Sequence, residues 1–139
     1  AMDALERLGI AGLAAQDIMT MSTGQARRVL VARELVRDPQ VLIFDEPCTG
    51  LDPEGMYHVR DTMRTLAAEG RSVILVTHYP EDIIPEIKRL VLVKEGKLFA
   101  DGSKEDMLTD QMMSSLFDVP LQVAKNGKKN EYFSLVSSY

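Results

Sequence analysis

Two apolar runs lie in the middle of this chain, and between them apolar residues recur at helical spacing. Residues 41–44 and 73–76 contain no polar side chain, and such runs are typical of strands buried on both faces of a parallel sheet. Between them, apolar residues recur at helical spacing over residues 53–68. A strand, a crossover helix and a second strand predict a parallel, right-handed βαβ unit. We therefore expect an α/β fold in which both strands end at the same edge of one sheet.

Shorter elements are expected on both sides of this unit. Asp38-Pro39 ends a helix before the first strand, because the residue before a proline is disfavoured in the α conformation. Asn126-Gly127 lies between two alternating segments, a pattern typical of a β-hairpin. The expected elements are a short amphipathic helix at 1–13, a helix at 26–36, strands at 90–93 and 97–100, short helices at 104–108 and 111–117, and a tail hairpin across 121–136.

Polar side chains follow both apolar strands. Asp45 and Glu46 end the first strand ahead of Pro47, which stops it, and His78 follows the second strand. In open parallel sheets, ligands bind beyond the carboxyl ends of the strands. A solvated acidic turn and a structural histidine are the simpler explanation of each feature alone. Together, the carboxylates and the imidazole predict a ligand site at one sheet edge.

Two helix starts carry further candidate residues. Ser22 or Thr23 can cap the helix that follows residues 21–25, and a helix start with a hydroxyl and a glycine suits an anion, since its first N–H groups have no helical acceptor. An ordinary capped helix is the alternative explanation. Asp52 precedes Pro53 and is therefore the expected N-cap of the crossover helix.

Composition narrows the class of protein. The chain has 139 residues and a formal net charge of −5, which fits one domain or part of one and does not indicate a broad nucleic-acid surface. Its single cysteine excludes an internal disulfide and fits a reducing compartment. The longest apolar runs are too short to span a bilayer. We expect no nucleic-acid partner.

Four motifs in order resemble those of the ATP-binding-cassette (ABC) ATPase family. Residues 21–25 resemble the signature LSGGQ, with methionine for leucine and threonine for the first glycine. Residues 41–47 resemble the Walker B strand, residues 49–52 the D-loop and residues 77–78 the switch histidine. The resemblance implies a three-layer, P-loop NTPase-type α/β domain with a mostly parallel sheet flanked by helices.

The resemblance also implies a domain organisation. Residues 1–120 correspond to the carboxyl-terminal portion of an ABC ATP-binding domain, with residues 1–38 ending its helical subdomain and residues 39–120 forming part of its α/β core. Residues 121–139 are a C-terminal extension that we expect to form a hairpin. Residues 90–123 are similar to importers for iron chelates and molybdate-type oxyanions.

The family implies ATP and Mg²⁺ as ligands and roles for the strand-end residues. Asp45 would hold Mg²⁺ through water, since magnesium keeps several of its waters. Glu46 would orient or deprotonate the attacking water. His78 would contact the γ-phosphate. These three residues form the expected hydrolytic site.

The same resemblance assigns the helix starts to nucleotide bound on a second domain. Ser22, Thr23 and Gly24 would face the γ-phosphate held by that partner, while Gln25 would shape the signature turn. Asp52 would link the two sites across the dimer seam. The expected partners are therefore a second nucleotide-binding domain and transmembrane transporter subunits, with the chain peripheral on the cytoplasmic face of the cell membrane.

One family motif is absent from the sequence. No G-x-x-x-x-G-K-[ST] loop occurs in these 139 residues; residues 127–129 come nearest but lack the upstream glycine and the hydroxyl. We expect an ABC transporter ATPase subunit, an importer, whose isolated chain is inactive. The alternative is a non-catalytic or soluble family member that lends its signature to a complete domain. In the family fold, the Walker A strand lies beside the strand that ends in the switch histidine. Without the Walker A strand, residues 72–77 would have an unpaired edge, which predicts a strand-exchanged homo-oligomer.

Overall fold

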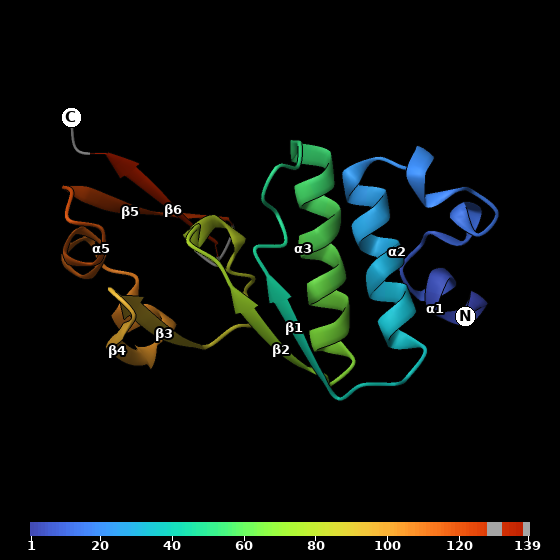
Figure 1. Cartoon of the computed structure of the whole chain (residues 1–139). Helices are drawn as coiled ribbons and strands as arrows, with labels where there is room; N and C mark the ends of the chain where they lie inside the picture. The colour runs from blue at the N-terminus through green and yellow to red at the C-terminus, as the bar shows by residue number, and fades with distance from the viewer. Residues whose placement is uncertain (128–131, 138–139) are drawn as a thin grey trace. The chain divides into compact units, whose positions relative to one another are not determined.

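The computed structural model describes residues 1–127 and 132–137 (Figure 1). The chain folds as two compact units, residues 1–77 and residues 78–139. The elements of the first unit are α1 (Met2–Arg7), η1 (Ala11–Leu13), η2 (Ile18–Thr20), α2 (Thr23–Leu35), β1 (Val41–Asp45), α3 (Pro53–Ala68) and β2 (Ser72–Val76). None of the helices in the described ranges is long and apolar enough to cross a membrane.

Strands β1 and β2 confirm the predicted βαβ unit. They pair in parallel, with Val41 opposite Ser72 and Asp45 opposite Val76, and α3 connects them over the length that the periodicity predicts. Leu42 is buried in β1, whereas Ile43 is 68% exposed. The prediction that both strand faces are buried is therefore wrong. Only one face of this two-stranded sheet packs into a core within the described residues, so the alternate side chains remain at the surface.

Helices α2 and α3 lie side by side in the first unit (Figure 1). A Cβ placed on Gly24 would lie 3.2 Å from the Cα of Gly55, so the two helices approach closely where both lack a side chain. Both caps follow the sequence: Ser22 caps α2 and Asp52 caps α3, whose first residue is Pro53. The core of this unit contains Met63 and Leu66 of α3, both fully buried, and other apolar residues: Ala4, Leu8, Ile10, Ala32, Leu35, Leu42, Phe44 and Val59.

The second unit contains two antiparallel hairpins and short helices. Its elements are η3 (Pro80–Asp82), β3 (Arg89–Lys94), β4 (Lys97–Ser103), α4 (Lys104–Met107), α5 (Asp110–Phe117), β5 (Leu121–Asn126) and β6 (Tyr132–Ser137). Strand β3 pairs with β4, and β5 pairs with β6, as the sequence predicts. Residues 128–131 of the tail hairpin lie outside the described residues. In the described ranges β2 pairs with β1 alone, which agrees with the unpaired edge expected from the sequence.

Candidate functional site

The start of α2 is held by a reciprocal cap. Ser22 Oγ accepts a hydrogen bond from the Gln25 N–H at 3.2 Å, and Gln25 Oε1 accepts one from the Ser22 N–H at 3.0 Å. Gln25 thus fixes the turn that the signature resemblance assigns to it. In the first helical turn, the N–H groups of Thr23 and Gly24 have no acceptor within the helix. This end of α2 therefore presents hydrogen-bond donors beside an exposed serine and threonine.

The start of α3 meets the start of α2 at a cavity of about 550 Å³. Asp52 Oδ1 accepts a hydrogen bond from the Gly55 N–H at 2.8 Å, which satisfies one donor of this second helix start. The cavity is lined by Ser22, Thr23, Gly24, Gln25, Arg28, Gly50, Leu51, Asp52, Glu54, Gly55 and His58. The structure thus brings the four predicted signature residues and the predicted D-loop aspartate to one cavity of the first unit.

The carboxyl end of β1 carries the two predicted strand-end carboxylates. Glu46 adopts a left-handed conformation, with φ of 46°, and its N–H donates to the Val76 carbonyl at 2.8 Å. Thr49 Oγ1 donates to Glu46 Oε2 at 3.2 Å. A positive φ in a non-glycine residue costs free energy and is sustained by such surrounding contacts. Glu46 is therefore held by backbone and side-chain bonds where β1 ends.

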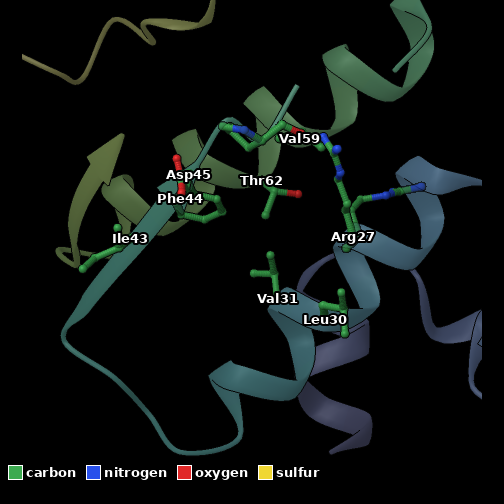
Figure 2. A pocket seen from close by; sticks show the side chains of 10 residues that line it. Arg27, Leu30, Val31, Ile43, Phe44, Asp45, Val59 and Thr62 are labelled. Atoms are coloured by element: carbon green, nitrogen blue, oxygen red, sulfur yellow. Dashed lines mark hydrogen bonds between the residues drawn. The ribbon is translucent and has the colours of Figure 1, made fainter. Parts of the chain in front are cut away.

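Asp45 lines a second cavity, of about 320 Å³, between α2, β1 and α3. Figure 2 shows Phe44, Val59 and Thr62 around this cavity, with Val31 and Leu30 contributed by α2. The lining is largely apolar, and Asp45 itself is exposed. Asp45 therefore reaches solvent at the strand end, and Glu46 is not among the residues that line either cavity.

Arg27 connects the signature helix to the loop after β1. Its guanidinium donates through Nη1 to the Pro47 carbonyl and through Nη2 to the Thr49 carbonyl, the latter at 2.7 Å. The sequence showed only a helical arginine, because neither periodicity nor motif spacing reports a contact across 20 residues. Arg27 thus fixes the loop between the strand-end carboxylates and Asp52.

Two further cavity residues were missed by the sequence analysis. Arg28 lines both cavities, and its buried Nε has no hydrogen-bond partner within the part of the chain that the structure describes. His58 lines the larger cavity, with its Nε2 3.8 Å from Glu54 Oε1 one helical turn away. The helical spacing of Glu54 and His58 is the signal that could have identified this pair.

His78 lies in a different unit from the other predicted site residues. Strand β2 ends at Val76, opposite Asp45, so the predicted meeting of the two strand ends is confirmed. His78 is the first residue of the second unit. Its ring lies against that of Tyr79, with centroids 4.0 Å apart and planes tilted by 41°. The convergence of His78 with Glu46 therefore stays a prediction.

The donor set fits a magnesium ion bound together with a nucleotide. Among residues 1–127 and 132–137, no three His, Cys, Asp or Glu side chains cluster closely enough to hold a metal ion by themselves. Magnesium in ATPase sites is commonly bound by one or two carboxylates, water and substrate phosphates. An exposed Asp45 at a strand end meets that requirement, whereas a dedicated protein cage does not exist in the described residues.

The fold and the placement of these motifs define part of a P-loop NTPase-type α/β domain. Residues 1–49 match the family model described as ABC transporter. An uncharacterized ABC transporter ATP-binding protein of Bacillus subtilis (strain 168), YlmA, is 40% identical over 128 residues, covering 91% of this chain and 48% of that protein. The Nod factor export ATP-binding protein I of Paraburkholderia xenovorans (strain LB400) is 34% identical over 102 residues, covering 73% and 34%. The chain belongs to the ABC transporter ATP-binding family.

Solved structures agree with this assignment. An inward-facing ABC transporter assigned to the metal-chelate type superposes with a TM-score of 0.87 at 23% identity, covering 99% of this chain and 55% of that one. The cbiO1 protein of Clostridium perfringens, part of the ABC transporter complex cbiONQ, gives a TM-score of 0.66 at 32% identity, covering 81% and 45%. The first similarity shows the fold alone. The chain spans about half the length of these relatives, or less.

Proposed function

We propose that this chain contributes to the ATP-binding and ATP-hydrolysing subunit of an ABC transporter, in which ATP closes two nucleotide-binding domains and hydrolysis reopens them. The observation that carries the proposal is the cavity between the starts of α2 and α3. It gathers the four signature residues and Asp52. These elements offer helix N–H groups and a hydroxyl to an anion, which is the chemistry that a triphosphate requires.

The signature residues act on nucleotide bound to a second domain. Ser22 Oγ accepts the Gln25 N–H, so its own O–H is oriented away from the helix and can donate to a γ-phosphate oxygen. The N–H groups of Thr23 and Gly24 add donors at the positive end of the α2 dipole. Asp52, fixed by its bond to Gly55, links the two nucleotide sites across the domain seam.

The strand-end residues act on the attacking water. Asp45 would hold Mg²⁺ through water, and the ion would supply charge neutralisation to the phosphates. Glu46 orients or deprotonates the water, with its backbone fixed by Val76 and its carboxylate by Thr49. His78 contacts the γ-phosphate. This chain is peripheral on the cytoplasmic face of the cell membrane, where transmembrane subunits convert domain closure into transport, and uptake is the direction that we propose.

A second candidate function is supported by a specific observation. The signature cavity forms within the first unit, and neither Asp45 nor Glu46 is among the residues that line it. A non-catalytic protein that lends its signature to a complete domain would need only that cavity. Substitution of Glu46 distinguishes the two functions: Glu46→Gln impairs ATP turnover only where this chain supplies the hydrolytic carboxylate.

Calorimetry with a complete homologous domain tests the proposed function. Purified YlmA is titrated with ATP in the presence and absence of this chain. A gain in the ATP affinity of YlmA that depends on residues 22–25 of this chain supports the proposal. Ser22→Asp keeps an N-cap acceptor but opposes the phosphate charge, so this variant should fold and lose the gain. Ser22→Asn, which keeps the cap without the charge, is the matched control. Equal gains with wild type and Ser22→Asp would contradict phosphate contact at this helix start.

A further inference from the structure

The C-terminal hairpin is bonded to the turn that follows His78. Glu81 Oε1, in η3, accepts a hydrogen bond from the Leu135 N–H of β6 at 2.9 Å, across 54 residues of sequence. Both residues belong to the second unit. A carboxylate that accepts a backbone N–H makes a charge-assisted bond, which is stronger than a neutral one. The turn and the hairpin are therefore joined at a defined point.

The opposite strand of the hairpin is bonded in the same way. Val123 of β5 is the registered partner of Leu135, and its N–H donates to Asp110 Oδ1 at 2.7 Å. Each of these N–H groups donates to a carboxylate outside the two strands, as the outward N–H groups of a non-hydrogen-bonded antiparallel pair do. One carboxylate thus accepts the outward N–H on each edge of the hairpin: Asp110 from α5 on one side and Glu81 from η3 on the other.

Further contacts fix the hairpin within the second unit. Ser114 Oγ accepts the Leu121 N–H at 2.9 Å and donates to the Leu121 carbonyl at 3.1 Å. Phe133 is 4% exposed, and the Nζ of the buried Lys104 lies 5.6 Å from the centre of its ring. Because β5 and β6 are anchored independently of η3, the Glu81 bond ties η3 to a fixed support.

A backbone hydrogen bond connects η3 to Tyr79, the residue that follows the histidine. The Asp82 N–H donates to the Tyr79 carbonyl at 3.0 Å, and Pro80 and Asp82 are buried. Tyr79 in turn packs its ring against that of His78. A displacement of η3 would therefore move the backbone of Tyr79, and with it the aromatic surface on which the imidazole lies.

We propose that Glu81 is a positioning residue for His78, acting through η3 and Tyr79 by holding the N–H of Leu135. This proposal rests on the proposed function, because the proposed function gives His78 its role at the γ-phosphate. Glu81 itself touches neither nucleotide nor reacting atoms in this scheme. The C-terminal hairpin then serves as the support for the histidine segment within the second unit.

Nuclear magnetic resonance of the two imidazoles tests this inference on the full chain without nucleotide. In Glu81→Ala, the His78 imidazole resonances should shift or broaden, and amide exchange at residues 79–83 should rise about tenfold. His58, in the first unit, is the internal reference and should not change. Asp110→Ala removes the equivalent carboxylate from the other hairpin edge and should leave His78 unchanged.

Unchanged His78 resonances in Glu81→Ala, or equal changes in Asp110→Ala, would overturn the inference, since the second result indicates general loosening of the hairpin. Should Glu81→Ala fail to fold, Glu81→Gln keeps an acceptor but removes the charge. A smaller shift of the same His78 resonances is then expected, and no shift would overturn the inference. Because no nucleotide is present, failure here is distinct from failure of the Ser22 experiment.

Discussion

The Glu46 N–H donates to the Val76 carbonyl at 2.8 Å, one residue beyond the last registered pair of the parallel sheet. This bond prolongs the pairing of β1 with β2 through a residue whose φ is positive. The proposed water-orienting carboxylate therefore belongs to the sheet edge and not to a loose turn.

The left-handed backbone of Glu46 should be visible in its tolerance to substitution. Asparagine adopts positive φ readily, whereas a β-branched residue is strained there. Glu46→Val should lose about 1–2 kcal/mol of unfolding free energy relative to Glu46→Asn. Urea denaturation of the two variants measures the difference. Equal stabilities would mean that residue 46 does not hold this conformation in solution.

The close approach of α2 and α3 should make Gly24 sensitive to a single methyl group. Gly24→Ala gains helix propensity, but its Cβ meets the Gly55 backbone at 3.2 Å, so the helices must separate. We expect a net loss of about 1 kcal/mol, because overpacking against backbone exceeds the propensity gain. Thermal unfolding measures this loss. Gly12→Ala is the matched control, since a Cβ there meets nothing within 4 Å; equal effects would contradict the prediction.

Arg27 should stabilise the loop that precedes Asp52. Arg27→Met keeps the aliphatic stem but removes both bonds, to the carbonyls of Pro47 and Thr49. We expect a loss of about 1–2 kcal/mol and faster amide exchange across residues 47–52. Arg33→Met is the control, because the ion pair that Arg33 makes within the described ranges joins it to the neighbouring Glu34 on the surface. Exchange that rises equally in both variants would refute the role of Arg27.

The pair formed by Arg89 and Asp101 should contribute to the acid stability of the β3–β4 hairpin. The hydrogen bond from Arg89, followed by its charge, lowers the pKa of Asp101, although burial opposes this. A lowered pKa in the folded state stabilises the protein above the unfolded pKa, and that contribution disappears as the pH falls through the folded value. Arg89→Gln should therefore flatten the acid side of the stability–pH curve, measured by thermal unfolding. An unchanged acid limb would show that the pair is broken in solution.

The exposed face of β1 and β2 should promote self-association. Ile43 and Ile74 are registered partners and are 68% and 48% exposed, and β2 has no second strand partner in the described ranges. Apolar surface beside an unpaired strand edge favours pairing with another chain. Sedimentation should show a concentration-dependent dimer that Ile74→Lys abolishes, with the surface variant Tyr57→Lys as control. A wild-type chain that stays monomeric at high concentration would contradict this prediction.

Local features of this protein followed from the sequence, and the contacts that connect them did not. Asp52 and Pro53 specified the start of α3, and two apolar runs specified a parallel pair, because caps and periodicities are encoded within a few residues. The hydrogen bonds of Arg27 and Glu81 span 20 and 54 residues, and the spacing of residues in the sequence does not indicate them. The prediction that both faces of β1 are buried was wrong, because an apolar run does not show how many layers pack on a sheet.

Measuring ATP turnover shows whether the signature cavity and the strand-end carboxylates serve a triphosphate that the chain does not hold alone. Phosphate release is measured for the purified chain, and then for the chain mixed with YlmA. We predict no turnover by the chain alone. In the mixture, we predict a change in the rate of phosphate release that depends on residues 22–25 of this chain. Turnover by the isolated chain that disappears in Glu46→Gln would show instead that the chain holds the triphosphate unaided.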